Sequence, residues 1–290
     1  LTSRSLSPSQ FLLPAYSLNA NTLYTVSVTV QHTVSLKSSS ASAKIQVKTG
    51  NVVAKLVDGT TAGLRMGETV LIDASPSYDD DIAYKRGVDA GLGFSFSCIQ
   101  TQPVYSDVCQ VNVESLTPVS KYRVSPSAET LLGSVHVITV IVRSSDMRSS
   151  QVSVVVTILP SLAPVVSVTS SSGLRINPSQ KLKLTGTVRA ASSGVAVWSV
   201  SDPSVSMSTA LSPVTSPITT STPQTMSFAL VLSPYALAER SSFTFTLRCV
   251  LDNGYASDAS IVISTNSPPL PGMYNVEPQT GGTMLETLFE

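Results

Sequence analysis

Alternation of apolar and hydroxyl side chains is the feature that most limits what this chain can fold into. Side chains of an extended strand point to opposite faces in turn, so a period of two predicts a half-buried antiparallel strand. The clearest run has Tyr24, Val26, Val28 and Val30 on one face and Thr25, Ser27 and Thr29 on the other. The pattern returns at Ile45/Val47, Leu182/Leu184 and Phe243/Phe245/Leu247. Helical spacings are hard to find, so we expect an all-β fold.

Composition supports strands and excludes several functions. Ser and Thr dominate the polar residues, and 18 Pro and 15 Gly punctuate the chain, which suits strands joined by turns better than helices. Lys+Arg 18 equals Asp+Glu 18, so the positive field that nucleic acid or an anionic membrane would attract is missing. No apolar run approaches the roughly 18 residues that span a bilayer, so we expect no membrane contact by this segment.

The sequence also repeats itself. The segment 14–18 (Pro-Ala-Tyr-Ser-Leu) is answered by 233–237 (Ser-Pro-Tyr-Ala-Leu), and an alternating strand follows each. Further along, Ala43-x-Ile45-x-Val47 is answered by Ala259-x-Ile261-x-Ile263. A looser copy lies at 135–158, and the aromatic strand 94–98 matches 196–200. The sequence therefore contains three copies of the end of one structural module.

These repeats divide the chain into four parts. Residues 51–160 and 161–265 each have about the hundred residues of an immunoglobulin-like sandwich. Residues 1–50 hold only the C-terminal strands of a truncated sandwich that begins upstream, because two strands cannot bury a core. Residues 266–290 form a linker and the start of a further segment. With short proline joints at 160–164 and 268–271, the expected arrangement is a section of a longer rod, cut from within a larger protein.

Motifs in two of these parts resemble the REJ (receptor for egg jelly) module. The stretch 71–79, Leu-Ile-Asp-Ala-Ser-Pro-Ser-Tyr-Asp, with 92–98 after it, is similar to the family's "LDAS-S-D … L-Y-W-S-C" signature. The ending 266–289 is similar to its "N-PP-G … P-G … T-F" segment. This sequence departs from the family at Phe96, where Trp is usual.

The resemblance implies tandem fibronectin-III-like or PKD-like sandwiches in the ectodomain of a large surface protein of the polycystin-one and egg-jelly-receptor type. It implies an extracellular structural or adhesion segment, on a cilium or flagellum and associated with a polycystin channel or a glycoprotein filament. Other surface proteins would be its partners. The inference runs from fold and family to function.

Three cysteines bear on the compartment. Cys98 and Cys109 have the spacing of a local disulfide, which requires an oxidising environment; two buried thiols are the alternative. Cys249 continues the face of Phe243 and Phe245 and is expected in the core, unless it pairs outside this segment.

The acidic run Asp79-Asp80-Asp81 is the one concentrated charge in the sequence. Such carboxylates can chelate Ca²⁺, but the spaced ligands and closing Glu of an EF-hand loop are missing. A solvated turn is therefore preferred over a calcium site. His32 and His136 lack companions at metal spacing, and no other cofactor is expected.

The segment 206–227 is rich in Ser, Thr and Pro and is expected to be an unpacked loop. Asn177-Pro178-Ser179 is blocked as an N-glycosylation site by its proline. Glycans on this glycoprotein should therefore be O-linked, with Ser212, Ser216 and Thr222 as candidates.

No nucleophile elbow, phosphate-binding loop or zinc-protease motif is present, so the chain is not expected to be an enzyme. The rival function is a secreted carbohydrate-binding, lectin-like β-sandwich. It would require exposed aromatic side chains to stack on sugar rings and a deep pocket, whereas aromatics are only 6% and mostly occupy core-face positions.

Overall fold

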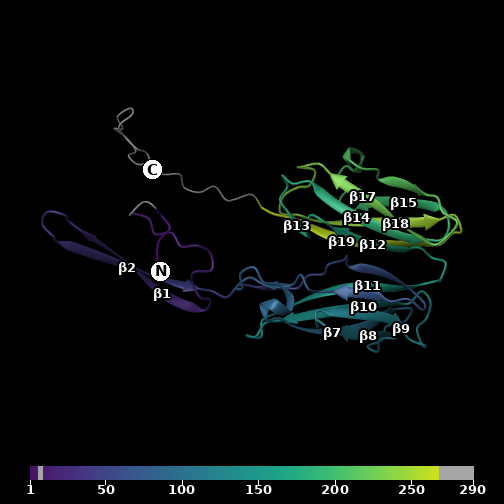
Figure 1. Ribbon diagram of the computed structural model, residues 1–290, viewed down its shortest axis with the longest axis horizontal. Helices are drawn as coiled ribbons and strands as arrows, with labels where there is room; N and C mark the ends of the chain where they lie inside the picture. Colours follow the sequence, from purple (N-terminus) through teal and green to yellow (C-terminus); the bar gives the residue numbers. More distant parts are fainter. Residues whose placement is uncertain (6–8, 268–290) are drawn as a thin grey trace.

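The computed structural model describes residues 1–5 and 9–267 and contains two β-sandwiches and a separate hairpin (Figure 1). The hairpin, here called the terminal hairpin, pairs β1 (Thr22–Gln31) with β2 (Ser38–Val47). Among the described residues there is no α-helix. The expected all-β, immunoglobulin-like class is confirmed.

The first sandwich spans residues 52–159. One sheet has the order β4-β11-β10-β7, a second has β5-β9-β8, and a short ribbon pairs β3 with β6. Its elements are β3 (Val52–Val53), β4 (Thr61–Arg65), β5 (Val70–Asp73), β6 (Tyr78–Asp79), the 3₁₀ turn η1 (Gly87–Ala90), β7 (Gly93–Gln102), β8 (Val111–Leu116), β9 (Lys121–Pro126), β10 (Val135–Arg143) and β11 (Ser149–Leu159).

The second sandwich spans residues 165–265. Its sheets have the orders β12-β14-β17 and β13-β19-β18-β15-β16. The elements are β12 (Val165–Ser170), β13 (Arg175–Ile176), β14 (Leu182–Ala190), β15 (Gly194–Val200), the 3₁₀ turn η2 (Met207–Thr209), β16 (Thr215–Ile218), β17 (Gln224–Leu232), β18 (Ser242–Leu251) and β19 (Ala256–Thr265).

Each sandwich closes over its own core. In the second, alternate residues of β18 are buried against the opposite sheet, and Trp198 on β15 joins them. In the first, Tyr122 and the alternate residues Ile138, Val140 and Val142 of β10 form the equivalent core. The alternation in the sequence is therefore the burial pattern of the central strands.

The two hairpins that the sequence repeat relates differ in how their second strand is aligned with the first. Tyr24 faces Ile45 across the terminal hairpin, whereas Phe243, the counterpart of Tyr24, faces Ile263 rather than Ile261. The connection after β1 (residues 32–37) is longer by two residues than the one after β18 (252–255), and this shifts the second strand along the first. Because the shift is even, the same faces stay together.

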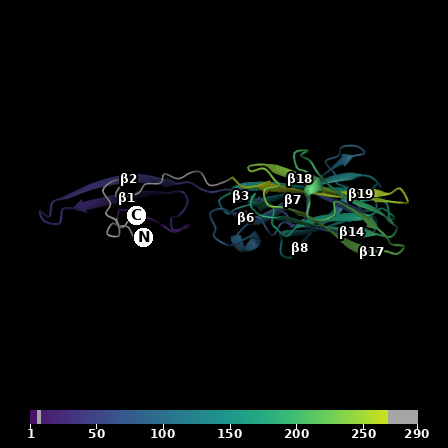
Figure 2. The same cartoon turned by 90° about the horizontal axis from the view of Figure 1, so that it is seen from above.

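The sandwiches are not stacked end to end as the rod arrangement predicts. They lie side by side, with the chain reversing through residues 160–164 (Figure 1). The terminal hairpin projects beyond one end of the pair (Figure 2). The proline joint at 268–271 and the segment 266–290, apart from residues 266 and 267, lie outside the described residues.

Candidate functional site

The interface between the two sandwiches explains why they fold back. Arg65, at the end of β4, is largely buried, and its Nε donates to the carbonyl of Ala163 at 2.8 Å. Its Nη2 donates to the carbonyl of Arg189 at 3.1 Å. Glu68 forms ion pairs with both Arg65 and Arg189. A buried guanidinium is tolerated only when its donors are satisfied, so this arginine ties the linker and β14 to the first sandwich.

Backbone groups also meet across the interface. Thr60 donates its N–H to the carbonyl of Ser260 at 3.1 Å, and the N–H of Ser260 donates to the hydroxyl of Thr61 at 2.6 Å. A Cβ added to Gly59 would lie 2.1 Å from the Ser260 carbonyl oxygen, so only glycine permits this approach. The two sandwiches are therefore held against each other by direct contacts and are not joined only by a flexible linker.

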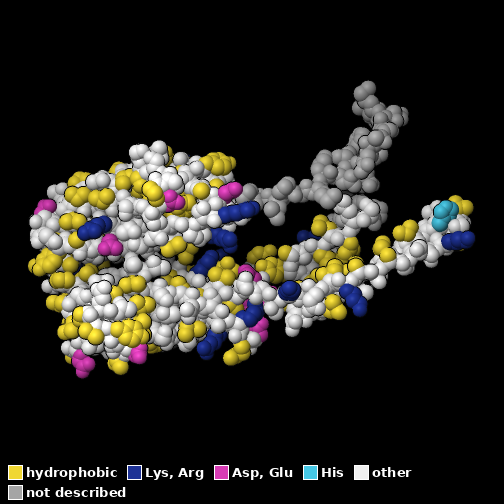
Figure 3. Space-filling view, turned by 180° about the vertical axis from the view of Figure 1, so that it is seen from behind, with side chains coloured by type: hydrophobic (Ala, Val, Ile, Leu, Met, Phe, Trp, Pro, Cys, Tyr) yellow, Lys and Arg dark blue, Asp and Glu magenta, His cyan; other side chains and the backbone are white. Residues whose placement is uncertain are grey.

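An open cleft of about 690 Å³ lies between the sandwiches, next to their connection with the terminal hairpin. Lys55 and Asp80 line one wall, and Arg175 and Arg240 line the other, so three cations share the cleft with one carboxylate. Figure 3 shows Lys and Arg side chains gathered along this groove. None of the three cations has an ion pair within the described residues.

The electrostatics of this cleft suit an anionic group. Burial and the positive charges of Arg86 and Arg175 lower the pKa of Lys55, although Asp80 opposes this shift. The Lys55 ammonium lies 4.9 Å from the centre of the Tyr78 ring, a cation–π contact. A carboxylate entering the cleft would relieve the repulsion among the cations. The ring of Tyr78 is already covered by Lys55 and is a poor platform for a sugar.

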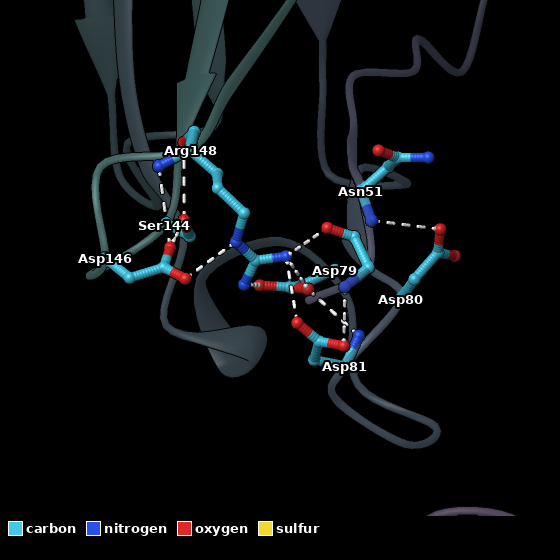
Figure 4. A network of polar contacts seen from close by, with 8 residues as sticks. Asn51, Asp79, Asp80, Asp81, Ser144, Asp146 and Arg148 are labelled. Carbon is cyan, nitrogen blue, oxygen red and sulfur yellow. Dashed lines mark hydrogen bonds and ion pairs between the residues drawn. The ribbon is translucent and has the colours of Figure 1, made fainter. Parts of the chain in front are cut away.

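Arg148 neutralises the acidic run, as Figure 4 shows. Its guanidinium lies 2.9 Å from Asp79, 3.0 Å from Asp81 and 2.7 Å from Asp146. Hydrogen bonds from Ser144 and Arg148 lower the pKa of Asp146. The expected turn is present, because the N–H of Asp81 donates to Asp79 at 3.0 Å and Asp80 is exposed, but Asp79 is buried and not solvated. A cation already occupies the centre of this cluster, and no group of three or more metal-binding side chains is found among the described residues.

The same cluster holds the start of the first sandwich. Arg148 Nη1 donates to the carbonyl of Gly50 at 2.7 Å, and the N–H of Gly50 donates to Asp81 at 2.9 Å. The N–H of Asn51 donates to Asp80 at 3.3 Å. The acidic run therefore acts as a joint that fixes the chain between the terminal hairpin and the first sandwich.

Cys98 on β7 and Cys109 before β8 form a disulfide, with Cα atoms 5.6 Å apart. His136 lies beside it, fully buried, with Nδ1 3.5 Å from the Cys109 sulfur and Nε2 2.9 Å from the Ser134 hydroxyl. Burial lowers the pKa of His136. Cys249 is a buried free thiol in the second core, and burial raises its pKa to about 11.

The Ser/Thr/Pro-rich segment is more ordered than the sequence predicts. It contains η2 and the edge strand β16, and the strand β17 begins within it. The half-buried Ser212 accepts a hydrogen bond from the N–H of Val231 at 2.8 Å, and Ser216 pairs with Ala196 in the sheet. Thr222 is exposed in the turn that follows. Of the three O-glycosylation candidates, Thr222 is therefore the most accessible.

Sequence reasoning misses the residues that create the interface and the joint. Arg65, Gly59 and Arg148 belong to no motif, and each of them contacts a residue that lies far away along the chain. Arg148 stands in a polar turn that looks solvated. The acidic run points to Arg148 only once its burial is known, because buried carboxylates need a cation beside them.

Comparison with known families decides the relationship. The REJ domain model matches residues 3–290. The chain belongs to the REJ domain family. This family and the immunoglobulin-like modules support an extracellular, adhesion-type segment. No curated protein matches the chain. No helix of the described residues is long and apolar enough to cross a membrane.

Solved structures with similar strand arrangements are distant. The Drosophila N-cadherin EC1-4 segment aligns at 10% identity and TM-score 0.34, over 87% of this chain and 60% of that one. Tandem Ig repeats of Dlar align at 9% identity and TM-score 0.25, over 75% and 98%. A nucleoside hydrolase-related hypothetical protein from Saccharophagus degradans aligns at 18% identity and TM-score 0.29, over 39% of this chain and 26% of that one.

Proposed function

We propose that this chain is a non-catalytic structural and adhesion segment of a large REJ-type cell-surface protein. Its tandem sandwiches would hold neighbouring parts of that protein at fixed positions and present faces to other surface proteins. The observation that carries the proposal is the REJ match over nearly the whole chain. The finer proposal places the parent protein on a cilium or flagellum, with a polycystin channel or a glycoprotein filament as partner.

The division of the chain is part of the same proposal. Residues 51–160 and 161–265 would be complete modules, residues 1–50 the C-terminal strands of another sandwich, and 266–290 a linker into a further REJ-type segment. The exposed terminal hairpin supports this division, because no second sheet covers its apolar side chains among the described residues. O-linked glycans would modify the exposed Thr222 first, and Ser212 and Ser216 less readily.

A lectin-like function has less support. The inter-sandwich cleft offers one aromatic side chain, Tyr78, and Lys55 covers its ring. The cations of this cleft would instead favour a carboxylate of a protein partner.

The test is surface exposure in the source cells. An antibody raised against this chain should label intact cells as strongly as permeabilised ones, and non-reducing mass spectrometry of the native protein should find Cys98 linked to Cys109. An antibody against a cytoplasmic protein, which should label only permeabilised cells, is the control. Labelling that requires permeabilisation, with three free thiols, would overturn the proposal.

A further inference from the structure

The histidine beside the disulfide stands where the first sandwich otherwise buries hydrocarbon side chains. His136 is the first of four alternate residues of β10 that are buried, and the three that follow it are Ile138, Val140 and Val142. Burial of a polar ring is unfavourable unless its nitrogen atoms find hydrogen-bond partners. Both nitrogens of His136 must therefore be accounted for.

The hydroxyl of Ser134 determines which nitrogen carries the hydrogen. Ser134 Oγ lies 2.7 Å from the carbonyl oxygen of Leu131, an atom that can only accept, so the single hydroxyl hydrogen is used there. The same oxygen lies 2.9 Å from His136 Nε2 and must then accept a hydrogen bond from this nitrogen. Burial lowers the pKa of His136 and so favours the neutral imidazole, which has one N–H. Nδ1 is therefore left with a lone pair.

The lone pair of Nδ1 faces a sulfur atom of the disulfide. Nδ1 lies 3.5 Å from Cys109 Sγ and has no other polar partner among the described residues. In the disulfide this sulfur carries no hydrogen, so it donates nothing to Nδ1. In the reduced chain Cys109 has an S–H group at the same place, and this group would donate to Nδ1. The thiol form of Cys109 therefore supplies the donor that this buried nitrogen lacks in the disulfide.

The two cysteines are positioned to react with each other. Their Cα atoms are 5.6 Å apart, within the range that a disulfide bridges, and Cys98 on β7 pairs with Ile138 of β10. Neither cysteine is fully buried, so a small disulfide can reach them from solvent. The charged residues of the two adjoining loops, Asp107 and Glu129, are exposed, and burial alone lowers the pKa of His136. The imidazole is therefore the base that faces this pair of sulfur atoms.

We propose that His136 is the general base that closes the bond between Cys98 and Cys109 when a low-molecular-weight disulfide, such as glutathione disulfide, oxidises the chain. Cys98 first exchanges with that disulfide, forming a mixed disulfide and releasing one thiol. Nδ1 then takes the proton of Cys109, and the Cys109 sulfur attacks Cys98 Sγ. The new S–S bond forms, the bond to glutathione breaks, and the departing thiolate is protonated as the imidazolium loses its proton to solvent. Two cysteines are oxidised, and one glutathione disulfide is reduced to two thiols.

A histidine with only a structural role is the alternative. Such a residue would fill space in the core and would change neither the reactivity of Cys109 nor the rate at which the bond closes. The inference concerns how the bond forms and not where the protein is displayed, so it can fail while the proposed function stands.

The first test compares the two thiols in the reduced whole chain. A limiting amount of iodoacetamide at about pH 7 should modify Cys109 about fivefold or more faster than Cys98, because Nδ1 accepts the proton of Cys109 as its sulfur attacks. Peptide mass spectrometry measures both rates. In His136→Gln, whose amide can still donate to Ser134, the ratio of the two rates should fall by about fivefold. A ratio that His136→Gln leaves unchanged would overturn the proposal.

The second test follows closure of the bond. Glutathione disulfide converts the reduced chain to the mixed disulfide, and acid quenching with mass spectrometry measures how fast this species closes. At about pH 7 His136→Gln should close about fivefold or more slowly than wild type, and the difference should shrink towards pH 9, where hydroxide removes the proton unaided. The matched control Ile138→Val, a change in the same strand that keeps the imidazole, should close within about twofold of wild type.

Equal slowing in His136→Gln and Ile138→Val would also overturn the proposal, because the loss would then come from looser packing and not from a missing base. If circular dichroism shows that His136→Gln does not fold, the wild-type chain alone decides. Its ratio of Cys109 to Cys98 modification should fall as the pH rises from about 7 to about 9, since both thiols then ionise without help. A ratio that stays constant over this range would reflect access alone and would exclude His136 as the base.

Discussion

The terminal hairpin and the hairpin β18–β19 follow the same sequence pattern but differ in the burial of their apolar side chains. Each begins after a left-handed tyrosine and has two strands of ten residues. On β18 the alternate residues are buried beneath β12, β14 and β17, whereas on β1 Tyr24 is half-buried and the following alternate residues are exposed. Alternation therefore sets which face is apolar, but a core requires a second layer to cover that face.

The largest difference should appear when one core side chain is shortened in each hairpin. Phe245→Ala should cost the second sandwich about 3–5 kcal/mol, because a buried ring leaves a cavity. The equivalent Val26→Ala should change stability by less than about 0.5 kcal/mol. Urea unfolding followed by Trp198 fluorescence measures the first variant, since this only tryptophan lies in the second core. Amide hydrogen exchange of residues 22–31 measures the second variant, and a loss of protection there as large as the loss in the second sandwich would show that the terminal hairpin is packed after all.

The third hairpin, β10–β11, is held by β7, which carries one end of the disulfide. Replacing Cys98 and Cys109 by serine should destabilise the first sandwich by about 2–3 kcal/mol, because a short covalent loop is released in the unfolded chain. Circular dichroism should record an earlier transition. The Trp198 signal of the second sandwich is the internal control, and an equal loss there would contradict a local effect.

Alkaline pH should destabilise the second sandwich through Cys249 on β18 and should not act on β1 in this way. Burial raises the pKa of Cys249 from 9.0 to about 11, so the folded state keeps its proton longer than the unfolded state. That stability is complete below pH 9 and is lost as pH rises to 11, by about 2–3 kcal/mol. Cys249→Ala should lose this part of the pH dependence in Trp198-monitored unfolding. A slope unchanged in the variant would rule out the thiol as its source.

Acid should weaken β10 selectively, with the smallest effect. Burial lowers the pKa of His136, so the unfolded state takes up a proton first as the pH falls. The contribution of His136 is therefore complete above about pH 6.5 and is lost as pH falls towards the folded-state pKa. His136→Gln should flatten this dependence, measured by circular dichroism between pH 7 and 5. The second sandwich contains no histidine and should keep its midpoint over this range.

Local pattern predicts the strands and the cores but not how the sandwiches meet. Trp198 and Cys249 lie in the core as their alternation predicts. The strand β16 is missed because Pro217 and its Ser/Thr-rich surroundings suggest a loop, yet an edge strand tolerates proline where no ladder bond is needed. The side-by-side docking depends on Gly59 approaching Ser260, a contact between residues some two hundred positions apart. No period or motif encodes such a pair.

The reversal at 160–164 changes how a pull along the polypeptide would travel. Asn51, where the chain enters the first sandwich, and Ser267, just after the second, line the same cleft. Tension would thus enter and leave the pair of sandwiches at neighbouring points. The force would not pass along the length of either sandwich. Stretching would first separate the two sandwiches, starting at the cleft and moving towards the reversal at 160–164. The chain would therefore lengthen only after the applied force had broken this interface.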